Sequence, residues 1–324
     1  MEQDQTNTGS AARLTKRIDP SIAYMLDRIV NVYFVGEPDA GDRRWVLVDS
    51  GLKGSAERIA RAAEEIFGSS RPAAIVLTHG HFDHIGSVRE LARRWDVPVY
   101  AHELELPYLT GRSSYPPPDP TVGGGAMARM AGLFPRGPID LGRRVLTLPA
   151  DGGVPAMHGW RWLHTPGHTA GHVSLFRAED RVLLAGDAFV TVKQESAIAV
   201  FSQRQEVHGP PAYYTTDWPE ARRSVERLAA LEPTLAATGH GVPMRGERLR
   251  EELRTLSAEF ERLAVPARGR YVHRAAVTDA SGVVDVPPPV ADPFPKIVAT
   301  AAIVAVAGVV ASRRRHRDDE ARDR

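Results

Sequence analysis

Short apolar runs alternate along the chain with segments whose apolar residues recur every three or four positions. Continuous apolar runs of this length are typical of buried strands, and they occur at residues 30–35, 44–48, 73–78, 97–101, 145–148, 172–176, 181–187 and 234–238. The helical spacing predicts helices at residues 55–66, 87–95, 220–231 and 248–263. Because strands and helices alternate, we expect an α/β fold.

Two long segments interrupt this alternation. The first lies between the runs at 97–101 and 145–148, and the second spans residues 191–214. Loops of this length within a compact domain are usually functional or disordered. We expect both segments to shape a substrate pocket, with a short helix after Gly125 covering it. Alternatively, both segments lie on the surface and pack only on themselves, without forming a pocket.

The two ends of the chain differ from its middle. Residues 1–20 are polar and predict a disordered tail. Residues 21–265 carry the strand and helix pattern, so we expect them to form one domain. Residues 266–295 predict a proline-rich linker, and residues 296–324 combine an apolar run with a charged tail.

The apolar run at residues 297–311 carries no charge on any face, which excludes an amphipathic surface helix. As a helix it would be about 22 Å long, shorter than the hydrocarbon core of roughly 30 Å. Flanking lysine and arginine side chains can reach across part of that deficit. The run therefore predicts a membrane tether or, alternatively, a helix docked on the domain or on a partner.

Composition narrows the class of protein. The hydrophobic content of 43% is ordinary for a globular domain, and the formal net charge of +1 gives no reason to expect nucleic-acid binding. The absence of cysteine excludes disulfides, thiolate metal ligands and a cysteine nucleophile. Because residues 1–20 contain no apolar signal segment, we expect a cytoplasmic protein, associated with a membrane if the C-terminal run is a tether.

The most informative cluster lies at residues 79–84, which read His-Gly-His-Phe-Asp-His directly after an apolar run. Side chains two positions apart on an extended chain point the same way, which applies to His79 and His81. Asp83 and His84 follow at a turn. Neutral imidazole nitrogens and carboxylate oxygens are ligands that zinc prefers. The cluster therefore predicts a metal site.

Three later segments repeat the order of strand, small residue and ligand-type residue, and they contribute His168, Asp187 and His240. Open α/β folds place their chemistry on loops beyond the carboxyl ends of strands. Asp49 ends the run at 44–48, and we expect it to orient ligands by hydrogen bonding or, alternatively, only to form a turn.

The order of these motifs over roughly residues 27–245 resembles the metallo-β-lactamase-fold hydrolase superfamily, and within it the glyoxalase II-like branch. The matching motifs are VDSG at 48–51, HGHFDH at 79–84, TPGHTAGH at 165–172, LLAGD at 183–187 and TGHG at 238–241. The resemblance implies a four-layer αββα sandwich with two divalent metal ions at one edge. Zinc is the expected metal, with iron or manganese as alternatives.

The resemblance also implies a role for each ligand-type residue. His79, His81 and His168 would bind one ion, and Asp187 would bridge to the other. The ligands of the second ion would be Asp83, His84 and His240. His164 and His172 flank the third motif, and we expect them to support the site and not to bind metal.

The charge of such a site favours hydrolysis. Two divalent ions outweigh Asp83, Asp187 and a bridging hydroxide, and metal binding lowers the pKa of water to about 7. We therefore expect a metal-bound hydroxide to attack an ester, thioester or related bond of a small molecule. The remaining positive charge would stabilise the oxyanion, and Asp83 would also orient the hydroxide.

Two departures from the family leave the substrate open. Gly241 and Val242 follow His240, where glutathione-thioester hydrolases carry a tyrosine, and Val190 and Thr191 stand where lactonases carry one. One alternative is a mononuclear iron oxygenase of the persulfide dioxygenase type, with His79, His168 and Asp187 as ligands. Another is a non-catalytic binding role, although no ligand type has been lost.

Overall fold

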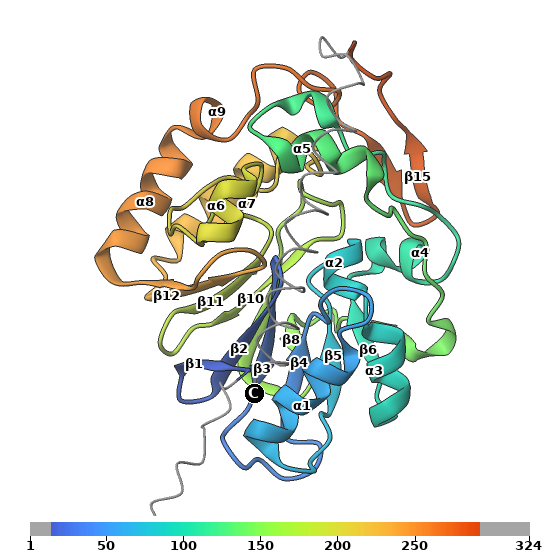
Figure 1. The fold of residues 1–324 in the computed structure, drawn as a ribbon, viewed down its shortest axis with the longest axis vertical. Helices are drawn as coiled ribbons and strands as arrows, with labels where there is room; N and C mark the ends of the chain where they lie inside the picture. The colour runs from blue at the N-terminus through green and yellow to red at the C-terminus, as the bar shows by residue number, and fades with distance from the viewer. Residues whose placement is uncertain (1–13, 292–324) are drawn as a thin grey trace, which may run out of the picture.

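The computed structural model describes residues 14–291, and this part of the chain forms two large sheets and one hairpin (Figure 1). The first sheet has the order β1 (Lys16–Asp19), β2 (Ile22–Asp27), β3 (Val30–Val35), β4 (Val46–Val48), β5 (Ala74–Val76), β6 (Val99–Ala101) and β7 (Val145–Thr147). Its strands pair antiparallel from β1 to β4 and parallel from β4 to β7.

The second sheet is mostly antiparallel, and only β11 and β12 pair in parallel. Its order is β13 (Met244–Arg245), β12 (Leu235–Thr238), β11 (Val182–Gly186), β10 (Val173–Arg177), β9 (Met157–His164) and β8 (Gly153–Val154). In both sheets the apolar runs of the sequence become strands, as predicted.

Alternation along the strands creates two apolar faces on each sheet. On β3, Tyr33 and Val35 pack in a core shared with Leu175 of β10 in the other sheet. Val32 and Phe34 of the same strand point to the opposite face, where they pack with helices. Strands buried on both faces read as continuous apolar runs, which explains the pattern of the sequence.

Helices cover the outer face of each sheet (Figure 1). On the first sheet these are α1 (Ala56–Phe67) and α3 (Val88–Trp95), and on the second they are α7 (Trp218–Ala230) and α8 (Gly246–Ala258). The short α2 (Phe82–Ile85) follows β5, and α9 (Phe260–Leu263) follows α8 after a break at Glu259. The layers therefore run helix, sheet, sheet, helix, which confirms the predicted α/β fold.

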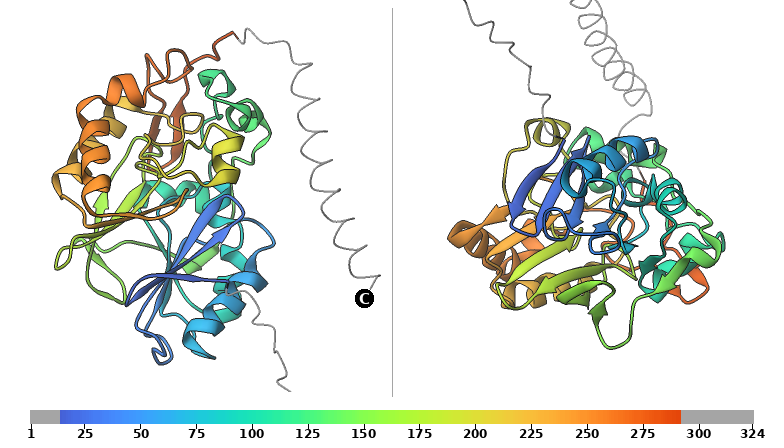
Figure 2. Two further views of the ribbon diagram at one scale, coloured as in Figure 1. Left: turned by 60° about the vertical axis from the view of Figure 1, so that its left-hand side comes forward. Right: turned by 90° about the horizontal axis from the view of Figure 1, so that it is seen from below.

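The two irregular segments pack against each other above the sheet edges (Figure 2). The first contains η1 (Glu103–Glu105), α4 (Leu106–Leu109), η2 (Pro120–Val122), α5 (Ala126–Met130), η3 (Ala131–Leu133) and η4 (Gly142–Arg144), and the second contains α6 (Ala197–Ser202). Met127 and Ala128 of α5 share a buried cluster with Val200, Tyr213 and Tyr214. A short helix after Gly125 is thus confirmed.

The boundaries of the domain differ from the prediction at both ends. Strand β1 lies within the predicted tail and extends the first sheet beyond β2. The predicted linker contains a hairpin of β14 (Val277–Asp279) and β15 (Gly282–Asp285). Its Val283 N–H donates to Ser113 Oγ over 3.1 Å, and nearby Tyr271 is buried in the second sheet's outer core. These contacts fix residues whose prolines and glycines had suggested a linker.

The predicted apolar segment at 297–311 lies outside the described residues. Among residues 14–291, no helix combines the length and apolar character that crossing a membrane requires.

Candidate metal centre

The seven predicted ligands come together at one edge of the two sheets. Residues 79–84 follow β5, His168 lies in the loop between β9 and β10, and Asp187 and His240 follow β11 and β12. Their ligand atoms form three overlapping groups, each within 4.8 Å: His79, His81 and His168; His79, His84 and Asp187; and Asp83, His84 and His240. The prediction that these side chains meet is therefore confirmed.

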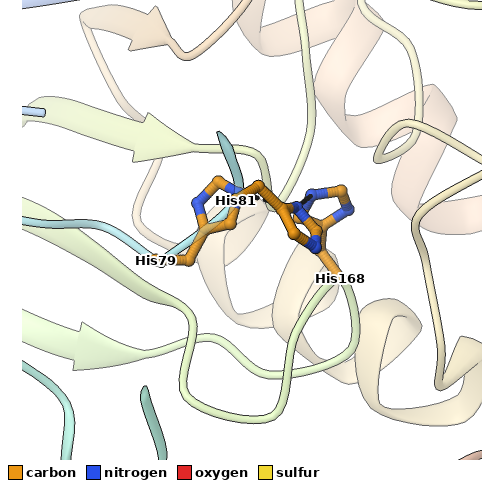
Figure 3. A group of neighbouring side chains, drawn as sticks. All are labelled: His79, His81 and His168. Carbon is orange, nitrogen blue, oxygen red and sulfur yellow. Dashed lines mark hydrogen bonds between the residues drawn. The ribbon is translucent and has the colours of Figure 1, made fainter. Parts of the chain in front are cut away.

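Three imidazoles converge in the first group (Figure 3). His81 Nδ1 lies 3.0 Å from His79 Nε2 and 3.0 Å from His168 Nε2. All three rings are buried. We refer to these residues as the three-histidine group.

The last of the three groups consists of Asp83, His84 and His240, and we call it the mixed group. His240 Nε2 lies 3.5 Å from Asp83 Oδ2. Asp187 Oδ2 lies between the groups, at 3.2 Å from His240 Nε2 and 3.5 Å from both His84 Nε2 and His168 Nε2. One carboxylate oxygen therefore faces residues of both groups.

Comparison with known proteins agrees with this arrangement. Residues 25–240 match the family model of the metallo-beta-lactamase superfamily. The chain is 49% identical over 231 residues to the probable metallo-hydrolase YflN of Bacillus subtilis (strain 168), covering 71% of this chain and 87% of that protein. This chain belongs to the metallo-beta-lactamase superfamily.

Two further matches extend the comparison. The probable metallo-hydrolase YybB of Bacillus subtilis (strain 168) is 31% identical over 195 residues, covering 60% of this chain and 74% of that protein. A crystal structure of a beta-lactamase domain protein from Burkholderia ambifaria has a TM-score of 0.54 at 19% identity and covers 79% of both chains. This second likeness shows the fold.

Membership confirms the predicted superfamily and identifies the chain as a member of an enzyme superfamily whose relatives are named as metallo-hydrolases. Metal-dependent hydrolase activity is what these relatives suggest. Superfamily members typically bind divalent metal ions, and the buried histidine and aspartate groups of this chain provide suitable donors. The glyoxalase II-like branch, the number of ions and their identity stay predictions.

Hydrogen bonds to the outer ring nitrogens orient two of the predicted ligands, as is usual for metal-binding histidines. His84 Nδ1 lies 2.8 Å from Asp49 Oδ2, and His240 Nδ1 lies 2.6 Å from the Ile29 carbonyl oxygen. Because carboxylate and carbonyl oxygens only accept, each Nδ1 carries a proton, and in the neutral form of each ring Nε2 would present its lone pair to the site. Asp49 is thus placed to orient His84, and its role in metal binding stays a prediction.

Threonine hydroxyls hold two rings of the three-histidine group. Thr78 Oγ1 donates to Asp49 Oδ2 over 2.8 Å, so it accepts from His79 Nδ1 at 3.1 Å. Thr215 Oγ1 donates to the Pro211 carbonyl oxygen, so it accepts from His168 Nδ1 at 3.2 Å. Both Nε2 atoms are therefore unprotonated on the side that faces the centre.

Within residues 14–291, two buried atoms of the centre have no hydrogen-bond partner: His84 Nε2 and Asp187 Oδ1. Buried polar atoms are nearly always partnered, and a bound ion is one recognised reason for an exception. The donor set and these two atoms together fit divalent metal ions.

The histidines of the two groups differ in the direction of their pKa shifts. Burial lowers the pKa of His79 and His81 well below the usual range, and that of His168 to about 3. For His84 and His240, burial also acts to lower the pKa, but nearby carboxylates, Asp187 first among them, raise it above its ordinary value. Metal ions bind the neutral form of imidazole, which the three-histidine group would supply without losing a proton.

Two supporting residues explain how Asp187 is placed. Its backbone N–H donates to His172 Nε2 over 2.8 Å, a contact that fits the prediction of a supporting role for His172. A side chain at Gly239 would bring its Cβ within 2.0 Å of Asp187 Oδ1, so only glycine fits beside this carboxylate. His164 instead lies outside the centre, where its ring stacks on His102 with centroids 4.2 Å apart.

Two residues that contact the loops of the candidate ligands could not be predicted from the sequence. Thr215, directly after the second irregular segment, contacts His168, and Glu105 contacts two of these loops from η1. Both lie outside the recognisable motifs, and their roles depend on tertiary contacts.

Proposed function

We propose that this protein is a dinuclear metal-dependent hydrolase of small-molecule esters, thioesters or related bonds. The three-histidine group would hold one ion and the mixed group the other, with Asp187 binding both. The observation that carries this proposal is the position of the Asp187 carboxylate between two buried donor groups. Zinc is the proposed metal because borderline cations match a set of imidazoles and carboxylates.

Bound divalent ions would polarise the scissile group and lower the pKa of water so that it attacks at neutral pH. The protein's own residues would orient the reactants. The His240 and His84 rings hold the pKa of Asp187 well below its usual range despite burial, so this carboxylate stays ionised. Burial raises the pKa of Asp83, which suits a carboxyl group that would orient the attacking water and take up its proton.

The irregular segments support a small substrate that enters beside His81. The rings of Tyr115 and Tyr214, one from each segment, lie 4.7 and 4.3 Å from the His81 ring. Tyr214 also neighbours Phe82 and Phe134, with centroids 6.3 and 6.4 Å away. Such an aromatic wall favours a substrate with an apolar acyl or aryl portion.

We place the chain in the glyoxalase II-like branch by its motifs, without the glutathione specificity of that branch. The position after His240 is Gly241, whose φ of +92° and close approach to Thr191 leave no room for a tyrosine side chain. A hypothetical Cβ there would lie 2.5 Å from Thr191 Oγ1. The local backbone therefore supports a substrate other than a glutathione thioester.

The oxygenase alternative is less well supported. An iron centre of that type would use only His79, His168 and Asp187, whereas four further donors lie buried around the same point. The relatives named as metallo-hydrolases also favour hydrolysis.

The test is a substrate panel of thioesters, aryl esters, lactones and phosphodiesters assayed with metal-loaded protein. We expect hydrolysis of at least one class, abolished by a chelator and restored by zinc. The exposed His158 provides a control, because His158→Ala should leave the rate unchanged whereas His168→Ala should remove it. Oxygen uptake with a persulfide, and no hydrolysis across the panel, would contradict the proposal.

A further inference from the structure

Glu105 is a fully buried carboxylate that the proposed chemistry does not use. It ends the short helix η1, and four groups donate to its side chain. Thr169 Oγ1 and the Gly171 N–H donate to Oε1 over 2.7 and 3.0 Å, the Gly80 N–H donates to Oε2 over 2.9 Å, and the Tyr115 hydroxyl also donates to Oε2. Two donors at each oxygen fit an ionised carboxylate.

Three of the four donors belong to the loops that carry the three-histidine group. Gly80 lies between His79 and His81, and Thr169 directly follows His168. The Gly80 N–H lies 2.9 Å from the Tyr115 hydroxyl as well, and the Tyr115 ring contacts the His81 ring. One carboxylate therefore joins the two loops whose histidine nitrogens converge.

Two glycines of the sequence motifs are required by this contact. A Cβ at Gly171 would lie 2.7 Å from Glu105 Cγ and Oε1. A Cβ at Gly80 would lie 2.6 Å from the Tyr115 hydroxyl and 3.3 Å from Glu105 Oε2. The glycines of His-Gly-His and Ala-Gly-His thus let the carboxylate approach the backbone, which links these motifs to a residue outside them.

Stability alone does not account for a charge at this place. Within residues 14–291 Glu105 makes no ion pair, and a buried charge without one is costly even when it is hydrogen bonded. The three-histidine group, in contrast, consists of imidazoles alone, so that apart from the shared Asp187 carboxylate it would face a divalent cation with neutral rings. A fixed negative charge behind these loops would offset part of that positive charge.

We propose that Glu105 is a positioning residue that fixes the spacing of His81 and His168 and thereby sets the affinity of the three-histidine group for its metal ion. This inference rests on the proposed metal binding. It distinguishes the two groups, because Glu105 contacts the loops of the three-histidine group and makes no hydrogen bond to Asp83, His84 or His240.

Thr169 offers the sharpest test. Thr169→Val removes the hydroxyl that donates to Glu105 and keeps the shape, whereas Thr169→Ser keeps the hydroxyl. Glu105→Gln removes the charge, and Glu103→Gln removes the same charge from an exposed position two residues away. Each full-length variant would be stripped of metal, checked by thermal melting, and titrated with Co²⁺ and with Zn²⁺ against a competing chelator.

We expect Thr169→Val and Glu105→Gln to weaken binding of one ion by roughly 10–100-fold, the usual cost of losing a residue that orients ligands. The Co²⁺ absorption of that ion should change, while the other ion binds as in the parent. Thr169→Ser and Glu103→Gln should match the parent.

Two results would overturn the role of Glu105 while leaving the proposed function intact. One is parent-like binding of both ions by Thr169→Val and Glu105→Gln. The other is a fall in melting temperature with unchanged metal affinity, which would mean that the contact only stabilises the fold. A parent protein that binds no metal would instead overturn the proposed function and this inference together.

Discussion

The three-histidine group and the mixed group both contain buried histidines, but the pKa values of these histidines differ. Both are buried at the same sheet edge, yet the histidine pKa values move in opposite directions. Burial dominates where only imidazoles meet, and carboxylates dominate around His84 and His240. The comparison shows that the neighbours of a buried histidine, and not burial alone, decide whether it is ready to bind a metal ion.

The groups also differ in what holds them. The three-histidine group depends on side chains from outside the sandwich, since Glu105 lies in the first irregular segment and Thr215 directly follows the second. The mixed group is held by the sandwich itself. Asp49 at the end of β4 orients His84, and Asn31 of β3 donates to the Gly241 carbonyl oxygen over 2.6 Å, next to His240.

Asp187→Ala should have the largest effect, because it removes the one side chain that faces both groups. We expect weaker binding at both positions and a loss of hydrolysis of more than about 100-fold, beyond the 10–100-fold cost of losing a residue that only orients a ligand. Elemental analysis after dialysis would measure the first effect and the substrate panel the second. The exposed Asp151 gives a matched control in Asp151→Ala. If Asp187→Ala binds two ions as tightly as the parent, Asp187 does not bridge them.

Asp49→Asn should produce a smaller and unequal effect. The amide keeps the shape of the side chain but accepts less strongly from His84 Nδ1, so we expect the mixed group to lose roughly 10–100-fold in affinity. The three-histidine group should lose less, because Asp49 reaches His79 only through Thr78. Chelator competition resolves the two affinities. An equal loss of affinity at both positions would contradict the proposal that different residues hold the two groups.

The motifs made the meeting of the candidate ligands predictable because most of them follow an apolar strand, and strand ends meet at a sheet edge. The pattern at 79–84 and the small residues before Asp187 and His240 are local signals of this kind. Glu105 could not be found in this way, since its hydrogen-bond partners lie 10 to 66 residues away along the chain. Strand β1 and the hairpin of β14 and β15 were missed for a related reason. Both are ordered by pairing with other strands and not by local apolar character.

Lowering the pH should release metal from the two groups at different pH values. This is the smallest of the effects that we predict. A protonated imidazole has no lone pair for a metal, so protons compete with metal below the pKa of each histidine. The pKa is raised for His84 and His240 and lowered for His79, His81 and His168, so competition begins at a higher pH in the mixed group. Dialysis in steps from about pH 8 to about pH 5 should release the mixed-group ion first. Release of both ions at one pH, or of the other ion first, would contradict the charge difference.

The most direct test of two metal-binding groups is the metal content of the parent protein beside His240→Ala. His240 belongs only to the mixed group. We predict close to two divalent ions per chain in the parent and close to one in His240→Ala, the remaining ion being bound by His79, His81 and His168. A single iron per chain in both proteins, or two ions retained in His240→Ala, would contradict the account.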